Sequence, residues 1–164
     1  MIVYGIISKS MKKMNYIVPD SKLEVGKSYN LIIEKKIALP DNKNFYIVID
    51  PNNKKHLLAA EFYKNYELDN KKEIICNVDE INCTGKIFFE PEHPYLKTGN
   101  YYKFNVLESS KAKDKKDNKF IKLKVKDYKN LIYTAISNVE IKETPKVIKA
   151  KIKRISKGRL YLEM

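Results

Sequence analysis

Glycine, proline and cysteine are scarce in this chain of 164 residues, and their scarcity excludes several classes of protein. With 5 glycines and 6 prolines, the sequence contains neither a collagen-like repeat nor a flexible Gly/Ser linker. Its two cysteines, Cys76 and Cys83, are too few for a disulfide framework. His56 and His93 could join them in a metal site, but the spacing of the cysteines does not match a zinc knuckle. We therefore expect ordinary thiols and no metal.

Long apolar runs are also absent. No window approaches the roughly 18 uncharged apolar residues of a membrane helix. The N-terminal stretch MIVYGIISKSMKK has too short an apolar run for a signal peptide, and its charges follow that run instead of preceding it. These features predict a cytoplasmic protein without a membrane partner.

The sequence lacks the signatures of the common catalytic sites. It contains no Gly-rich phosphate loop, no GxSxG and no HExxH, and its two histidines lie far apart beside turns. Its carboxylates are scattered singly among lysines, so no pair is marked for acid–base work. We expect a protein that is not an enzyme and needs no cofactor.

Positive charge is abundant and unevenly distributed. The formal net charge is +13, but residues 1–97 hold 15 basic and 13 acidic side chains, whereas residues 98–164 hold 18 and 7. A lysine-rich composition inherited from an A·T-rich genome would raise the lysine content throughout the chain and would not concentrate lysine in one half. The asymmetry favours a polyanionic partner for the second half.

The chain contains an internal repeat. Three blocks recur in the same order: 26–29 with 99–102, 45–60 with 120–135 without a gap, and 78–90 with 152–163. Three matches in one order, at nearly constant separation, indicate a duplication and therefore two similar units.

Each unit is predicted to consist of strands. YYKFNVLE, FIKLKVKD and VIKAKIKRI alternate apolar and polar residues, which places one set of side chains in a core. Gly85 and Gly158 mark a closing hairpin in each copy, and the segments before it are too short for more than a turn or two of helix. A five-stranded closed barrel accounts for this order, because closure removes exposed strand edges. A single open sheet is the alternative.

The order of these signals also points to a known family. Gly26 and Tyr29 precede a strand, Phe45 and Asp50 are followed by a turn and HLL, and the unit closes with V-x-x-I-x-x-x-G-K-I-F-F. This pattern, present in both repeats, resembles the S-one RNA-binding domain, the OB-fold repeat named for a ribosomal protein. The resemblance implies OB-like barrels with single-stranded RNA as the ligand.

We therefore predict an all-β fold of two tandem five-stranded OB-like barrels, barrel 1 at residues 23–92 and barrel 2 at residues 95–164. The opening VYGIISKSMKKMNYIVPDS is similar to CNVDEINCTGKIFFEPEHPY, so residues 1–22 are predicted to form an extra β-hairpin that packs on a barrel. Strand exchange with another copy and an evolutionary remnant are the alternatives. The Pro-bracketed turn EPEHPY, residues 90–95, is expected to couple the barrels rigidly.

Barrel 2 offers the two groups that single strands need, cations for phosphates and aromatic rings for bases. In FIKLKVKDY, alternate residues are predicted to face inward, which leaves Phe120 and a ladder of lysines outside. The resemblance implies stacking at Phe120, at Phe45 in barrel 1, and a second contact at Tyr133, where the family's usual histidine is missing. The polar stretch 108–119 is predicted as a loop. The nucleic-acid-binding residues predicted in barrel 2 are Lys103, Phe120, Lys122, Lys124, Tyr128, Tyr133, Lys151, Lys153, Arg154 and Arg159.

Barrel 1 has a different central strand. In FYIVID, the outward set Phe45, Ile47 and Ile49 is as apolar as the inward set. A strand that is apolar on both sides is normally covered on both sides, here by the hairpin, by barrel 2 or by a protein partner. Two functions remain open: a non-catalytic protein that binds single-stranded RNA or DNA on barrel 2, or an assembly module whose lysines only maintain solubility.

Overall fold

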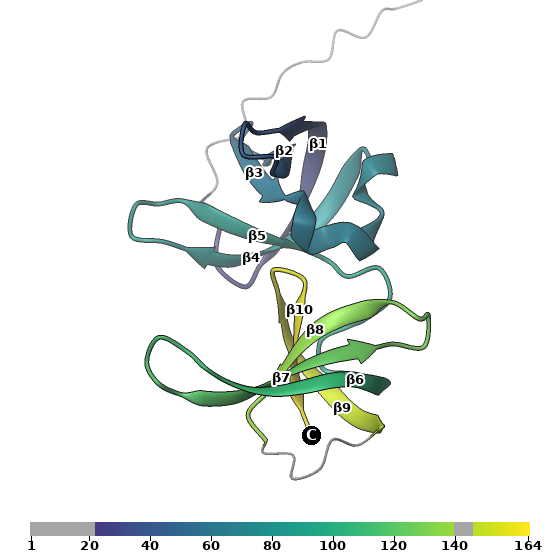
Figure 1. The fold of residues 1–164 in the computed structure, drawn as a ribbon. Coiled ribbons are helices and arrows are strands. Elements are labelled where there is room, and N and C mark those ends of the chain that lie inside the picture. Colours follow the sequence, from purple (N-terminus) through teal and green to yellow (C-terminus); the bar gives the residue numbers. More distant parts are fainter. Residues whose placement is uncertain (1–21, 140–145) are drawn as a thin grey trace, which may run out of the picture.

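The fold is nearly all β, as predicted. The computed structural model describes residues 22–139 and 146–164, whose strands form two five-stranded, barrel-like sheets (Figure 1). The hairpin predicted at the N-terminus falls on residues 1–21, outside the described residues. Barrel 1 contains β1 Ser28–Ala38, β2 Asn44–Ile49, β3 Lys55–Ala59, the 3-10 helices η1 Ala60–Tyr66 and η2 Leu68–Asn70, β4 Glu73–Ile81 and β5 Ile87–Pro91. Barrel 2 contains β6 Tyr101–Lys113, β7 Lys119–Lys126, β8 Ile132–Ser137, β9 Val147–Ser156 and β10 Arg159–Glu163.

The sheet of barrel 1 is antiparallel, with the strand order β3-β2-β1-β4-β5. Within the described residues no backbone ladder joins β3 to β5, so the predicted closure is incomplete in this unit. The reason is that β3 ends at Ala59, where the chain turns into η1. Side chains span the gap instead, since the rings of His56 on β3 and Phe89 on β5 meet edge to face, with centroids 4.9 Å apart.

Barrel 2 closes completely, in the order β10-β8-β7-β6-β9. A parallel ladder between β8 and β10 and antiparallel ladders from β9 to both β6 and β10 complete the ring. The predicted inward residues of β7 are buried in the core: Ile121, Leu123 and Val125. The alternation in FIKLKVKD therefore predicted the two faces of this strand correctly.

The two units repeat each other, but their middle strands correspond differently from the ungapped alignment. The first strands match as predicted, since Tyr29 and Tyr102 each accept the backbone N–H of the residue five positions earlier. The alignment set Asp50 against Val125, but the structural equivalent of Asp50 is Asp127, because both aspartates bond the same backbone groups in their turns. The additional residues of barrel 2 lengthen the β6–β7 hairpin.

This longer hairpin corrects the prediction of a loop at residues 108–119. β6 continues to Lys113 and β7 begins at Lys119, with cross-strand pairs along the whole extension. The stretch is polar on both sides because it projects beyond the barrel core, so alternation could not mark it as strand.

Four hairpin turns share one geometry. In each, an Asp or Asn oxygen accepts the backbone N–H groups of the second and fourth following residues, and the third following residue has a positive φ. Asn, Asp and Gly tolerate this conformation, so these pairs set where each hairpin turns. The pairs are Asp50 with Asn53, Asn82 with Gly85, Asp114 with Asp117, and Asp127 with Asn130.

Candidate functional site

The outward side of β7 and β8 carries the lysine ladder predicted from the sequence. Lys122, Lys124 and Lys126 alternate with the buried residues of β7 and stand beside Ile136, Thr134 and Ile132 of β8. A hollow of about 320 Å³ opens here, with Lys122, Lys124 and Thr134 in its lining. We call this surface, the outward residues of Lys122–Lys126 and Ile132–Ile136, the lysine face.

One lysine of this face is already paired. The Lys124 Nζ donates to Glu108 Oε1 on β6 at 3.2 Å. Both side chains are largely exposed, so this pair contributes at most about 1 kcal/mol and an arriving phosphate can replace the carboxylate. Lys122 has no acidic partner within the described ranges.

Among the predicted site residues, the aromatic ones differ most from the sequence-based assignment in position and exposure. Tyr133 is only 4% exposed, and its hydroxyl donates to Asp127 Oδ2 at 3.1 Å inside barrel 2. It therefore offers no surface for a base, and its assignment as a stacking residue is wrong. The assignment followed from the family resemblance. With Asp127 matched to Asp50, Tyr133 corresponds to His56, whose Nε2 lies 2.8 Å from Asp50 Oδ2.

Other aromatic rings do reach the surface of barrel 2. Tyr128, in the β7–β8 turn, is 63% exposed, and Phe120 is half-buried at the start of β7. Tyr161 on β10 was not among the predicted residues, yet it pairs with Ile136 at the edge of the lysine face. The Arg154 guanidinium lies 5.6 Å from its ring centroid. Alternation in the closing strand RLYLEM could have revealed Tyr161, because its neighbours Leu160 and Leu162 are buried.

Three predicted cations lie on a different wall of barrel 2. Lys103 on β6 pairs with Lys149 on β9, and Lys151 pairs with Tyr101. Lys153 follows on the same strand and is exposed. The fold thus divides the predicted residues between a β7–β8 wall and a β6–β9 wall, and does not gather them in one groove.

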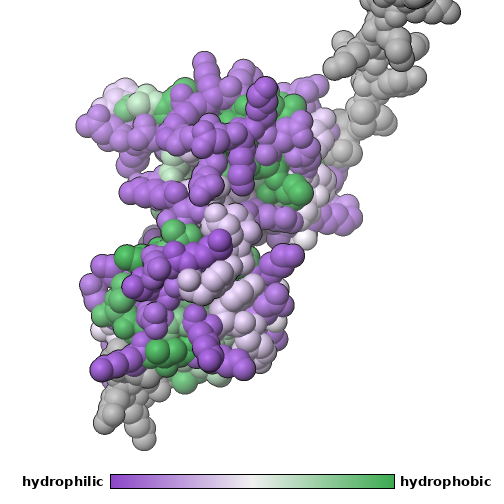
Figure 2. All heavy atoms as spheres, turned by 90° about the vertical axis from the view of Figure 1, so that its right-hand side faces the viewer, coloured by the Kyte–Doolittle hydropathy of each residue, from purple (hydrophilic) through white to green (hydrophobic). Residues whose placement is uncertain are grey.

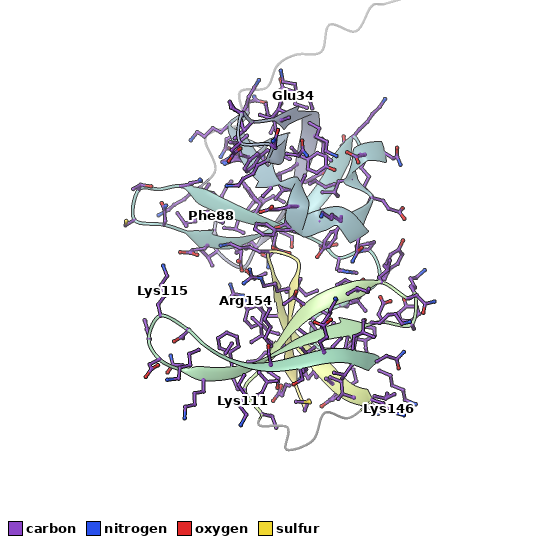
Figure 3. The ribbon with its side chains drawn as sticks, in the orientation of Figure 1. Glu34, Phe88, Lys111, Lys115, Lys146 and Arg154 are labelled. Atoms are coloured by element: carbon purple, nitrogen blue, oxygen red, sulfur yellow. The ribbon has the colours of Figure 1, made fainter. Side chains whose placement is uncertain are left out.

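Arg154 has a structural partner in barrel 1. Its Nη2 donates to both oxygens of Asp79 on β4, at 3.0 and 3.1 Å, and Ser156 Oγ donates to the same carboxylate at 2.6 Å. Figure 3 shows Arg154 at the junction between the two units. This side chain joins the barrels, while Arg159 is exposed beside the β9–β10 turn.

Glu90 forms the centre of the same junction. Its buried carboxylate accepts the backbone N–H groups of Lys157 and Gly158, at 2.6 and 3.2 Å, and the Tyr63 hydroxyl at 2.9 Å. Burial raises the pKa of Glu90, and these three donors partly offset the rise. Glu90 was expected to act in coupling the barrels, and its bonds to Lys157 and Gly158 run from one barrel to the other.

An aromatic cluster fills the space beside Glu90. The ring of His93 lies 4.7 Å from that of Tyr66 on η1 and 5.4 Å from that of Tyr133. His93 Nδ1 accepts the backbone N–H groups of Tyr95 and Leu96, so Nε2 carries the proton. Burial lowers the pKa of His93 to about 4. Neither His93 Nε2 nor the Tyr66 hydroxyl has a hydrogen-bond partner in the described part of the chain.

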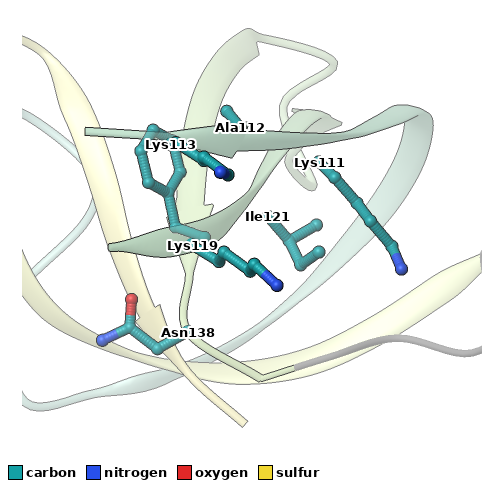
Figure 4. Close-up of a pocket in the computed structure, with 7 residues that line it drawn as sticks. Lys111, Ala112, Lys113, Lys119, Ile121 and Asn138 are labelled. Carbon is teal, nitrogen blue, oxygen red and sulfur yellow. The ribbon is translucent and has the colours of Figure 1, made fainter. Parts of the chain in front are cut away.

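A hollow of about 520 Å³ lies at the end of the β6–β7 hairpin (Figure 4). Lys111, Lys113 and Lys119 surround it, together with Ile121 and Asn138. Phe120 also lines it. Lys113 pairs with Asp117 across the turn at 2.9 Å, and both side chains are exposed. The hollow combines an aromatic ring with cations, which suits a nucleotide base and its phosphate.

The equivalent face of barrel 1 is apolar. Phe45, Ile47 and Ile49 are half-buried, and beside them Ile32 and Leu57 are 50% and 53% exposed. The described residues therefore do not cover this face completely. The cover predicted from FYIVID could also be the N-terminal hairpin, which falls outside the described residues, or a protein partner, so that prediction stays open. In the side view of Figure 2, hydrophobic side chains reach the surface of both units, and hydrophilic ones border the waist between them.

The described residues hold no cluster of three or more His, Cys, Asp or Glu side chains that could bind a metal ion. Cys76 is buried and Cys83 is exposed, and neither forms a disulfide. Burial raises the pKa of the Cys76 thiol, which makes it a poor nucleophile. No helix in the described ranges has the length and hydropathy needed to cross a membrane.

Comparison with known proteins identifies no relative, so a function has to be argued from the geometry of the structure. No family model, no curated protein and no solved structure matches this chain.

Proposed function

We propose that this protein is a non-catalytic binding protein for single-stranded nucleic acid, and that its units are OB-like barrels. The strand order of barrel 2, with a parallel ladder between its third and fifth strands, supports the OB-like assignment. The observation that carries the function is the lysine face: Lys122, Lys124 and Lys126 lie in one row on the outward side of the middle strands.

The lysines bind the phosphates and release condensed counterions, which provides most of the affinity. Bases stack on rings at the borders of the face, where Tyr161, Phe120 and Tyr128 are placed. Phosphate contacts and stacking do not read base edges, so binding is expected to depend little on sequence.

The test is fluorescence anisotropy with labelled oligouridylate and oligothymidylate at a low and a high salt concentration. We expect micromolar or tighter binding at low salt that weakens steeply as salt is added. Comparing the affinities for oligouridylate and oligothymidylate shows whether RNA or DNA is preferred. Failure of both oligonucleotides to bind at low salt would refute the proposal. Glu108→Gln, which frees Lys124 from its carboxylate partner, should tighten binding several-fold.

A second function, a protein-interaction module, is favoured by the apolar face of barrel 1. Ile32 and Leu57 are half exposed beside Phe45, Ile47 and Ile49, and the face extends over three strands. Lys35 and Lys55 pair with Ile47 and Ile49 on the same side and border these apolar residues. Exposed apolar side chains rimmed by charged ones are typical of protein interfaces. Ile47→Lys combined with Leu57→Lys should abolish capture of a protein partner and leave binding of oligonucleotides unchanged. If the double variant loses oligonucleotides instead, this face belongs to the nucleic-acid site.

A further inference from the structure

The junction of the barrels contains a basic cavity apart from the lysine face. It measures about 310 Å³ and lies between η1 of barrel 1 and both β8 and the β9–β10 turn of barrel 2. Its cations come from both units, Lys64 from η1 and Lys157 and Arg159 from the turn and β10. Glu61 is the single carboxylate in its lining. Within residues 22–139 and 146–164, none of the three cations has an acidic partner.

This cavity and the lysine face share a wall. The β8 residues 132–134 line both the cavity and the hollow that contains Lys122 and Lys124. A strand bound along the lysine face can therefore pass over β8 and enter the cavity without leaving the protein surface.

The two sides of the cavity are held in a fixed relation. Asn65 Nδ2 on η1 donates to the backbone carbonyl of Ile132 on β8 at 3.1 Å. The Glu90 carboxylate binds the N–H groups of Lys157 and Gly158, and Gly158 packs so tightly that a Cβ there would clash with the carbonyl oxygen of Phe62. Cations from separate barrels are thus positioned before any ligand arrives, which lowers the entropic cost of binding.

We propose that the inter-barrel cavity is a phosphate-binding subsite that holds the nucleic-acid backbone where it leaves the lysine face. Lys64 and Lys157 act as point charges, and Arg159 can bond two phosphate oxygens in a fork. The proposal rests on the function proposed above and adds barrel 1 to the binding surface. Short strands occupy the lysine face alone, whereas longer strands reach the cavity as well.

The test compares oligouridylates of about 5 and about 15 nucleotides, a range that spans the site size of one OB fold. The variant Lys64→Gln with Arg159→Gln should bind the short strand as the wild type does. It should bind the long strand about tenfold more weakly, with a salt slope smaller by about 1.4, because two phosphate contacts are lost. Lys122→Gln with Lys124→Gln should weaken both lengths. Lys86→Gln is the control, since Lys86 lies in the β4–β5 loop, on the opposite side of the molecule from η1 in Figure 1.

Each negative outcome of this test would refute a different part of the proposal. If the wild type binds neither length, the proposed function itself is wrong. If the wild type binds both and the cavity variant retains the affinity and salt slope for the long strand, the cavity is no subsite and the lysine face binds alone. Equal weakening of both lengths by the cavity variant would also overturn the proposal, because the short strand would then already occupy the cavity.

Discussion

Barrel 1 and barrel 2 present opposite chemistry at equivalent positions. With the turn at Asp50 matched to the turn at Asp127, the outward residues of β2 correspond one by one to those of β7: Phe45 to Lys122, Ile47 to Lys124 and Ile49 to Lys126. Their neighbours correspond in the same way, because Leu57 and Thr134 occupy the same place on the third strands. The outward residues of β2 are apolar and those of β7 are cationic on the same arrangement of strands.

This difference teaches how a duplicated strand can change its partner without changing its fold. Side chains of a strand alternate between its two sides, so the outward set can be replaced while the inward set stays apolar. In β2 the inward residues Tyr46 and Val48 are buried, and in β7 Leu123 and Val125 are buried. The core specifies the barrel, and the outward face is free to specialise.

Gly158 and Gly85, the glycines of the two closing turns, should respond very differently to substitution. Both have a positive φ, but a Cβ at Gly85 would meet open space, whereas one at Gly158 would clash with Phe62. Gly85→Ala should therefore cost about 1 kcal/mol of unfolding free energy. Gly158→Ala should cost about 4 kcal/mol, because the backbone strain is joined by loss of the Glu90 bonds. Urea unfolding of both variants measures this, and equal losses would mean that the junction contributes nothing.

Introducing carboxylates on the lysine face and on the equivalent face of barrel 1 should affect oligonucleotide binding very differently. Lys122→Glu with Lys124→Glu should weaken oligonucleotide binding about 10²-fold at low salt, because contacts are lost and repulsion is added. Phe45→Glu with Ile47→Glu introduces carboxylates at the equivalent positions of barrel 1 and should have little effect beyond the screening length of about 10 Å. Anisotropy titrations of the two variants test this. Similar losses of affinity in both variants would show that the two faces do not differ in their contribution to oligonucleotide binding.

The linker between the barrels should make stability depend on pH. Burial holds the pKa of His93 near 4, below its ordinary value of 6.5, so the unfolded chain binds a proton that the folded protein does not. The contribution of His93 alone should lower the free energy of unfolding by about 2 kcal/mol as the pH drops from 6.5 to 4.5. The raised pKa of Glu90 acts in the opposite direction, destabilising the fold as the pH rises above about 4.5.

His93→Asn isolates the histidine contribution, because Asn can still accept backbone N–H groups but does not titrate. The difference in unfolding free energy between wild type and variant should change across this pH range. A constant difference would contradict the assigned protonation of His93.

Two tyrosines of η1 provide the smallest predicted effect. Tyr63 donates to Glu90, whereas the Tyr66 hydroxyl is buried without a partner in the described residues. Tyr63→Phe should destabilise the protein by about 1 kcal/mol, and Tyr66→Phe should be neutral or slightly stabilising. Thermal unfolding of both variants distinguishes them, and a larger loss for Tyr66→Phe would mean that its hydroxyl has a hydrogen-bond partner.

Much of the fold could be predicted from local pattern. Alternation identified β7 and β9 with the correct inward sets, and the recurring glycines indicated two units. The ungapped alignment of residues 45–60 with 120–135 missed the longer β6–β7 hairpin, and the family resemblance assigned a stacking role to Tyr133, whose ring is buried. The turn pairs Asp50–Asn53 and Asp127–Asn130 could have corrected the alignment, since both follow the same spacing.

The amino-acid sequence by itself determined the strands, their inward faces and the concentration of positive charge in barrel 2, because these depend on residues close together in the chain. Only the tertiary structure decided that Arg154 pairs with Asp79 and that Glu90 binds the turn at Gly158. Those partners are 75 and 68 residues apart in the chain, and no periodicity in the sequence predicts such contacts. The packing of one barrel against the other brings them together, and with them the cations of both units.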